Sequence, residues 1–343
     1  MRLLPHFLFI IGIMTYKEEK LGVFIVPTGV GASIGGYAGD ASNFAREFTQ
    51  FGTLIVNPNV VNAGCFSGIN EKMLYVEGYA IDELFKGNLK LKESKNNKVG
   101  IVFDKSIPKD VLNIHINTMC AVQTVYGVEI LDYNITEENV GVEFYIDDSG
   151  ISTGRVNNIQ TLLNSAKELV KNGCDAIGVV CLFADDNLNE DYENGEGVDP
   201  VGGVEAIISH YITKELNVPC VHSPAFCDYE ITSKIVNPKA AAEYITPTFL
   251  PCILLGLMNA PKLKKENEED FDISIENVDY LVMPHNCLGS IPVFEAIKRG
   301  IKVYAIKENV TLLNVTNESI NKTCGIYTVD TYEKCLELIK RGI

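Results

Sequence analysis

Basic side chains are in short supply in this chain. Its 29 lysines and arginines stand against 45 aspartates and glutamates, which gives a formal net charge of −16. A charge of this size repels the phosphate backbone of nucleic acids and anionic lipid surfaces. The basic residues also form no stripe with aromatic residues between them. We therefore expect no nucleic-acid partner and no membrane partner.

Other sequence patterns are absent as well. The ten cysteines are scattered without a Cys-x-x-Cys pair, and several lie inside apolar runs, as buried thiols do, which argues against a disulfide scaffold and for a reducing, cytoplasmic compartment. Short repeats, low-complexity tracts and apolar runs long enough to cross a bilayer are missing. The apolar start resembles a signal peptide without a small-x-small cleavage site, and Met14 is an alternative start. Residues 1–20 are accordingly expected to form an N-terminal extension.

Hydrophobic runs of strand and helix character alternate along the rest of the chain. This pattern predicts an α/β fold of doubly wound, mainly parallel sheets with helices on both faces, Rossmann-like and arranged in two lobes, 21–150 and 151–343. Two neighbouring runs, 129–133 and 140–146, are expected to pair as an antiparallel edge, and 262–272 reads as a charged break. We expect strands at 22–26, 53–56, 98–103, 176–183, 218–221, 280–283 and 302–306, and helices at 41–51, 108–127, 158–172, 203–216, 238–244, 247–258, 290–299 and 332–340.

A glycine-rich loop, PTGVGASIGGYAGDA at 27–41, directly follows the first expected strand. Its glycines permit positive φ, and their backbone amides can cradle a phosphate or carboxylate. The spacing differs from the dinucleotide fingerprint by one residue and no Walker lysine follows. A tight turn without a ligand is the alternative. Asp40 is expected to cap the next helix, to bind an amine or metal, or to exchange protons. The expected ligand contacts are Thr28, Gly29, Gly31, Ser33, Gly35 and Gly36.

Several strings in the chain are characteristic of one family. They are PTGVGASIGGYAGDA, NPNVVNA at 57–63, YVEGYAID at 75–82, GVDPVGGVEAIISH at 197–210, PCVHSPA at 219–225 and TFLPCILLGL at 248–257. With them the chain resembles the family catalogued as domain of unknown function 3326, over nearly its whole length from residue 21. The resemblance implies one integrated protein, and that family has no assigned reaction to carry over.

A second polar constellation is DYLVMPHNCLGS at 279–290, a strand that ends in a polar loop before a helix. Cys287 would lie at the helix start, where the macrodipole lowers the pKa of a thiol and makes it a nucleophile or a proton-abstracting base. The layout is similar to that of the two-cysteine racemases and isomerases, with Cys181 as the second cysteine. A small buried residue is the alternative. The expected ligand contacts here are His285, Asn286 and Ser290.

Further candidates follow other strands or begin helices. Asp199 precedes the pair Gly202 and Gly203 at a helix start, which could bind an anion or hold an acid–base carboxylate, with a simple turn as the alternative. Glu308 and Asn309 follow the strand 302–306 and are expected to contact the ligand. A zinc site built from Cys220, His222, His285 and Cys287 is a minor alternative. His210 is expected to cap its helix, and Glu77 to serve in a turn.

Together these features predict an enzyme that acts on a small anionic metabolite bearing a carboxylate or phosphate. Proton transfer, as in an isomerase, racemase or lyase, would use Cys287, Asp199 or Asp40. A nucleotide or nucleotide-sugar transferase is one alternative, and a metabolite-binding regulatory protein without catalysis is another. No cofactor or metal is assigned, and a homo-oligomer is left open.

Overall fold

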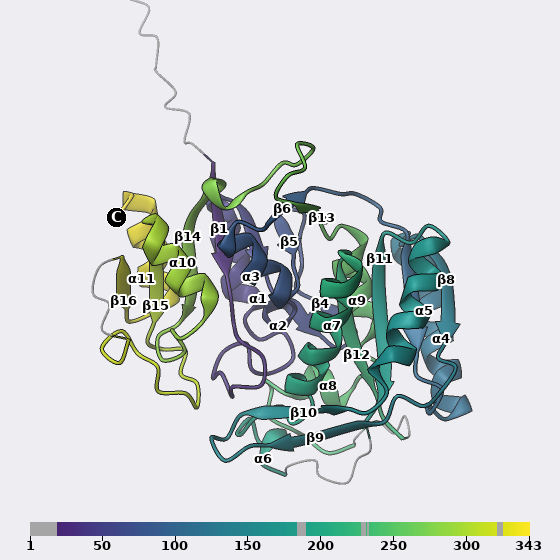
Figure 1. The fold of residues 1–343 in the computed structure, drawn as a ribbon. Coiled ribbons are helices and arrows are strands. Elements are labelled where there is room, and N and C mark those ends of the chain that lie inside the picture. The colour runs from purple at the N-terminus through teal and green to yellow at the C-terminus, as the bar shows by residue number, and fades with distance from the viewer. Residues whose placement is uncertain (1–18, 184–189, 228–230, 232, 321–324) are drawn as a thin grey trace, which may run out of the picture.

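The computed structural model describes residues 19–183, 190–227, 231, 233–320 and 325–343 (Figure 1). Of the expected N-terminal extension, residues 1–18 lie outside this range. The expected mixed α/β fold with a mainly parallel sheet is confirmed. No helix in the described part of the chain has the length and apolar content that a bilayer crossing needs. The cysteines within the described residues are all free thiols.

The larger sheet has six parallel strands. Strand β1 (Lys20–Phe24) lies near the centre of this sheet. It pairs with β2 (Gly52–Val56) on one side and with β14 (Val278–Pro284) on the other. Successive side chains of a strand point to opposite faces of the sheet, so each face has its own apolar core. Val23 of β1 packs on one face and its neighbour Phe24 on the other. In spatial order the strands are β16 (Ile326–Val329), β15 (Lys302–Ile306), β14 (Val278–Pro284), β1 (Lys20–Phe24), β2 (Gly52–Val56) and β5 (Met73–Tyr75).

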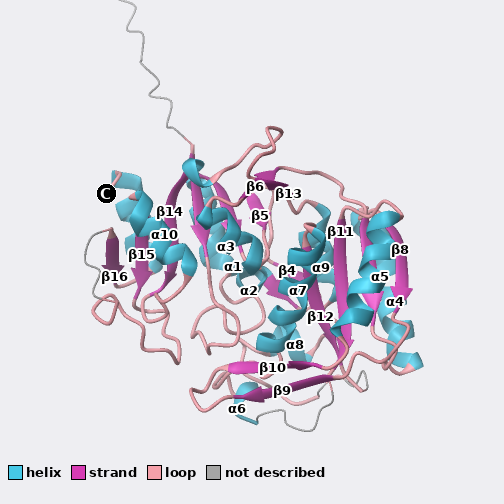
Figure 2. Cartoon of the chain, in the orientation of Figure 1, coloured by secondary structure: helices cyan, strands magenta, loops and turns pink. Residues whose placement is uncertain are grey.

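The second sheet has four parallel strands and lies beside the first (Figure 2). Its order is β12 (Cys220–Ala225), β11 (Ala176–Leu182), β7 (Val99–Phe103) and β8 (Ile130–Ile135). The expected antiparallel edge of 129–133 with 140–146 is wrong. Strand β8 pairs in parallel with β7, and β9 (Val142–Ile146) pairs instead with β10 (Ser152–Val156), which was not predicted.

Two further antiparallel pairs complete the strands. One joins β6 (Leu89–Lys92) to β13 (Lys262–Lys265), and the other joins β3 (Asn62–Ala63) to β4 (Phe66–Ser67). The expected charged break at 262–272 therefore contains a strand. Leu263 is the one buried residue of β13, and the three lysines around it are partly or fully exposed.

Helices cover both faces of each large sheet. On the six-stranded sheet, α1 (Ser42–Phe48) and α11 (Tyr332–Arg341) lie on one face, and α3 (Gly78–Lys86) and α10 (Ile291–Arg299) on the other. On the four-stranded sheet, α4 (Lys109–Tyr126) and α9 (Leu250–Met258) lie on one face, and α5 (Ile159–Lys171) and α7 (Gly202–Leu216) on the other. The short segments are α2 (Pro58–Val61), α6 (Glu190–Glu193), α8 (Ala241–Tyr244), η1 (Thr49–Phe51) and η2 (Ile275–Asn277).

The two sheets pack against each other through shared apolar contacts. One apolar core contains side chains from both sheets, and α3 of the first sheet contacts α7 of the second. Each sheet also combines strands from before and after residue 150, so the expected boundary between 21–150 and 151–343 does not coincide with the division into sheets.

The order in which the chain adds strands reverses at the middle of the larger sheet. From β1 the chain adds β2 and β5 on one side, and later β14, β15 and β16 on the other. The neighbours β1 and β14 thus form a topological switch point, where the loops after adjacent strands diverge. Open parallel sheets bind ligands in the crevice at the carboxyl ends of such strands.

Candidate functional site

A cavity of about 870 Å³ opens at the carboxyl ends of strands from both sheets. Pro27 follows β1, Asn57 follows β2 and Glu77 follows β5, while Pro224 belongs to the end of β12. Ser290, in the loop between β14 and α10, also lines it. The cavity therefore reaches the β1–β14 switch point, and its far wall comes from the second sheet.

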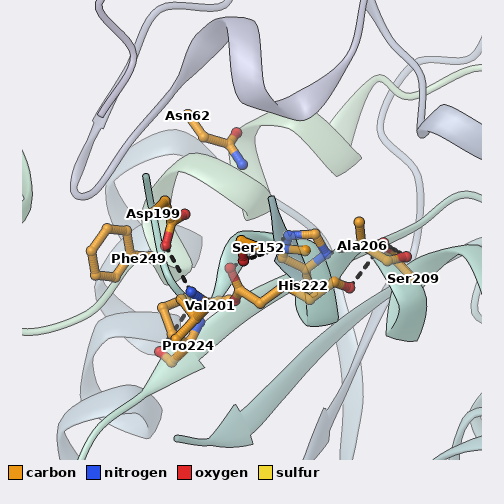
Figure 3. A network of polar contacts seen from close by, with 12 residues as sticks. Asn62, Ser152, Asp199, Val201, Ala206, Ser209, His222, Pro224 and Phe249 are labelled. Carbon is orange, nitrogen blue, oxygen red and sulfur yellow. Dashed lines mark hydrogen bonds and ion pairs between the residues drawn. The ribbon is translucent and has the colours of Figure 1, made fainter. Parts of the chain in front are cut away.

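One wall is built by α7 and the adjacent strand β12. Glu205 and Ser209 are four residues apart on α7, so they project from the same face of this helix. The Ser209 Oγ lies 2.9 Å from Nδ1 of His222 on β12 (Figure 3). The other imidazole nitrogen, Nε2, lies 3.7 Å from the Glu205 Oε2. A hydroxyl, an imidazole and a carboxyl group thus meet at the cavity wall.

The hydrogen bonds of Ser209 favour one tautomer of the His222 imidazole. The Ser209 hydroxyl has helix carbonyls as acceptors, at 3.3 Å on Ala206 and 3.4 Å on Glu205. With its proton directed there, Oγ accepts the Nδ1–H of His222 and leaves a lone pair on Nε2. His222 lines the cavity, so this nitrogen is placed to accept a proton.

Burial shifts the pKa values of His222 and Glu205. Desolvation, followed by the charge of His210, lowers the pKa of His222 to about 3. Desolvation, followed by the charges of Asp199 and Glu243, raises the pKa of Glu205 well above its ordinary value. His222 is therefore neutral near pH 7, and burial favours the protonated form of the Glu205 carboxyl. Its Oε1 is buried and has no hydrogen-bond partner among the residues that the structure describes.

A charged pair lies on another part of the wall. His210 Nε2 is 2.6 Å from Oε1 of Glu77, whose Oε2 accepts hydrogen bonds from the amides of Tyr79 and Ala80 at the start of α3. Burial lowers the pKa of His210, but the bond to Glu77 outweighs it and the net shift is upward. The expectation that His210 caps its helix is wrong, because this residue lies within α7. Burial also raises the pKa of Asp82 beside this pair to about 6.

Carboxylates and tyrosines form the third part of the wall. Asp199 Oδ1 accepts the Val201 amide at 3.0 Å, as Figure 3 shows, so the carboxylate itself occupies the start of α7. Burial raises the pKa of Asp199. Burial, followed by the charge of Asp199, raises the pKa of Glu243 to about 8. The Tyr192 hydroxyl lies 3.2 Å from Glu243 Oε1, and its ring stacks on Tyr37 with centroids 4.8 Å apart.

The glycine-rich loop lines the cavity only in part, through Thr28 and Gly36 among the expected contacts. Five of its amides, those of Ser33, Ile34, Gly35, Tyr37 and Asp40, bind acceptors of the protein itself. Asp40 Oδ1 accepts the amides of Gly35 and Tyr37, so this carboxylate takes the place expected for a ligand anion. The expectation that Asp40 caps α1 is wrong, since Ala41 precedes that helix and no side chain caps it. Burial raises the pKa of Asp40 to about 6.

Asn309 holds the same loop from the opposite side. Its Oδ1 accepts the Ile34 amide at 3.0 Å, and its Nδ2 donates to the Ile34 carbonyl and to the Tyr332 hydroxyl, each at 2.7 Å. The Ser33 hydroxyl lies 3.2 Å from the Glu308 carbonyl. Ser33, Glu308 and Asn309 do not line the cavity, so the structure places these expected ligand contacts in a brace behind it.

The remaining loop glycines allow close packing. Gly29 and Gly31 have φ of 73° and 60°, as expected for a turn that only glycine adopts easily. A Cβ on Gly203 would lie 1.9 Å from the Ser152 carbonyl oxygen. Gly29, Gly31, Gly202 and Gly203 are absent from the cavity wall, where they were expected to touch the ligand.

Cys287 does not have the environment that a reactive thiol needs. It is buried, its Sγ donates to the Pro284 carbonyl at 3.3 Å, and burial raises its pKa to about 12. The expected lowering of this pKa is wrong, because α10 begins only at Ile291. Asn286 bonds to the backbone of Thr311 and Leu313, and neither it nor His285 lines the cavity, although Ser290 does.

Sequence reasoning missed most of this site. Glu205, Ser209 and Glu243 were not singled out, Glu77 was interpreted as a turn residue, and His222 entered only as a zinc ligand. A usable signal was present in the expected helix 203–216, where polar residues interrupt an apolar face. In the described part of the chain, no group of three or more histidine, cysteine, aspartate and glutamate side chains is arranged to hold a metal ion.

Comparison with known proteins gives a family but no reaction. A protein of Synechococcus sp. described as an uncharacterised lipoprotein is 37% identical over 298 residues, which cover 85% of this chain and 83% of the relative. No solved structure matches. The family model described as "Protein of unknown function (DUF3326)" matches residues 21–341. The chain therefore belongs to the DUF3326 family, as its glycine-rich loop and the other strings indicated.

Proposed function

We propose that this protein is an enzyme that transfers protons on a small metabolite bound in the cavity, with His222 as the base and Glu205 as the acid. The observation that carries the proposal is the arrangement of Ser209, His222 and Glu205, in which Nε2 lies 3.7 Å from Glu205 Oε2 at the cavity wall. Isomerisation and elimination both need one group that accepts a proton and another that donates one.

The proposed transfer keeps the charge of the site balanced. His222 Nε2 takes a proton from a carbon of the substrate, and the electron pair of that bond moves into the substrate. Glu205 gives its proton to the atom on which negative charge develops. The carboxylate that remains lies beside the new imidazolium and stabilises it. This coupling offsets the low pKa of His222 in the free protein, since the base gains its proton as the acid loses one.

Hydrogen exchange with solvent tests the proposal before the substrate is known. The protein is incubated in D₂O with pools of small metabolites, and deuterium incorporation is read by mass spectrometry. We expect exchange at one carbon-bound position, and a loss of at least 100-fold in His222→Gln and Glu205→Gln. Glu215→Gln, an exposed carboxylate on the same helix, is the matched control. Saturable binding with no exchange in any pool would instead favour a regulatory protein.

The strand order and the position of the cavity also support a more specific proposal about the fold. We propose a Rossmann-like, two-lobed molecule in which each large sheet with its helices is one lobe, supported by the parallel strand order and the cavity at the strand ends. Native-state hydrogen exchange that fails to separate the two sheets would contradict it. The cytoplasmic location and a homo-oligomer stay predictions. Cell fractionation will show whether this protein is in the cytoplasm or in the membrane fraction, as the name of the lipoprotein relative suggests for that protein.

A further inference from the structure

The cavity wall carries more acidic than basic side chains. Its acidic residues are Glu77, Asp82, Asp199, Glu205 and Glu243. His210 pairs with Glu77, and Lys234 is 73% exposed and pairs with Glu193. Among the described residues, no lysine or arginine forms an ion pair with Asp199, Glu205 or Glu243. Asp199, Glu205 and Glu243 form one end of the cavity, which we call the acidic end.

One buried carboxyl oxygen at the acidic end has no hydrogen-bond partner in the described part of the chain. Glu205 is 6% exposed, its Oε2 lies on the side of His222, and its Oε1 makes no hydrogen bond. An acceptor buried without a partner costs about 1–3 kcal/mol. Because Glu205 lines the cavity, a donor on a bound ligand would satisfy Oε1. The oxygen remains an acceptor when the proton of the carboxyl group is on Oε2.

Aromatic rings stand beside the carboxylates. Tyr37 and Tyr192 stack with centroids 4.8 Å apart, and both line the cavity. The hydroxyl of Tyr192 bonds to Glu243, which brings the ring pair and this carboxylate together. The faces of such rings attract cations, most strongly where water is excluded. One face of Tyr37 already holds a cation, because Lys239 Nζ lies over this ring, 5.6 Å from its centroid, and donates to the Ser33 carbonyl. Tyr192, whose hydroxyl bonds to Glu243, is therefore the ring that a ligand can use.

The chemistry of the acidic end favours an organic cation over a metal ion. An ammonium group has three N–H donors and tolerates ring contacts, whereas magnesium and calcium need six or more oxygen ligands in a compact shell. The described residues contain no cluster of three ligating side chains arranged for a metal.

We infer that the acidic end binds the ammonium group of an amine substrate, with N–H donors directed to Asp199, Glu243 and the free Oε1 of Glu205. This inference rests on the proposed function, for which it names the substrate class. The ammonium holds one end of the molecule while the neighbouring carbon lies near His222. An amine takes the place of the anionic metabolite expected from the glycine-rich loop, whose Gly35 and Tyr37 amides already bind Asp40.

Three probes of equal chain length test the charge preference. The full chain is titrated calorimetrically at low salt with 1,4-diaminobutane, 1,4-butanediol and succinate, which end in cations, neutral groups and anions. We expect saturable binding of the diamine alone. Tighter binding of succinate, or equal binding of the diol, would overturn the inference. So would displacement of the diamine by Mn²⁺ with tighter binding of the metal.

Variants locate the binding site. Glu243→Gln keeps the shape of the side chain and should weaken diamine binding at least tenfold, while Glu215→Gln leaves it unchanged. Asp199→Asn is the second variant, and a melting curve shows whether each variant folds. Unchanged binding in a folded Glu243→Gln protein would refute the inference. Hydrogen exchange is scored separately from diamine binding. Diamine binding without exchange in any pool contradicts only the proton-transfer proposal, and exchange without diamine binding contradicts only the amine site.

Discussion

Replacement of Asn309 by alanine should destabilise the protein by about 3–5 kcal/mol. The Asn309 side chain is completely buried and joins the glycine-rich loop to α11. Its removal leaves the Ile34 amide, the Ile34 carbonyl and the Tyr332 hydroxyl without partners. A buried polar group left unpaired costs about 1–3 kcal/mol, and the upper part of the summed range is reduced where water enters the space.

Urea denaturation followed by circular dichroism measures this loss. A loss of about 3–5 kcal/mol should lower the melting temperature by roughly 4–7 °C in a chain of 343 residues. Asn309→Asp should be nearly as harmful, because a carboxylate cannot donate to the Ile34 carbonyl. Asn164→Ala, on the exposed face of α5, is the control and should change stability by less than about 0.5 kcal/mol. A loss below about 1 kcal/mol in Asn309→Ala would show that the loop does not depend on this brace.

The other expectations concern packing, reactivity and pH. Gly203→Ala should destabilise the protein by at least ~3 kcal/mol in urea denaturation, because the new Cβ would lie 1.9 Å from the Ser152 carbonyl oxygen; a near-normal midpoint would contradict this packing. Iodoacetamide at pH 8 should modify the exposed Cys120 and spare the native Cys287, whose pKa is raised to about 12, and peptide mass spectrometry would reveal the reverse. The pKa of His222 is lowered from 6.5 to about 3, so the unfolded chain binds this proton first and stability falls as pH drops through that window. His222→Gln should make the fall shallower, and an NMR titration of the imidazole near pH 6.5 would disprove the assignment.

The sequence contained enough information for the local structure of this fold. Hydrophobic periodicity located the strands near β1, β2, β7, β11, β14 and β15 and most long helices, because each buries an apolar face that shows in its own residues. It failed where pairing is decided at a distance. The pairing of β8 with β7 rather than with β9 depends on which edge of the sheet is free, and no residue of β8 records that choice.

The site was harder to predict for the same reason. The loop at 27–41 has the composition of an anion cradle, and its positive φ angles were anticipated. Its amides are nevertheless satisfied by Asp40 and by Asn309, and the latter lies 275 residues away from Ile34. The pairs His210–Glu77 and His222–Ser209 likewise exist only after α7 packs between β12 and α3. Residue type identified chemically capable side chains, but tertiary packing decided which of them share a cavity.

The central position of β1 has a consequence for synthesis on the ribosome. Its partner β14 begins only at Val278, so β1, β2 and β5 emerge long before the six-stranded sheet can be completed. Until then one edge of β1 lacks its hydrogen-bonded neighbour and is open to pairing with other chains. A nascent chain that stalls before residue 278 would therefore be prone to aggregation, whereas one released after β14 has emerged can cover that edge.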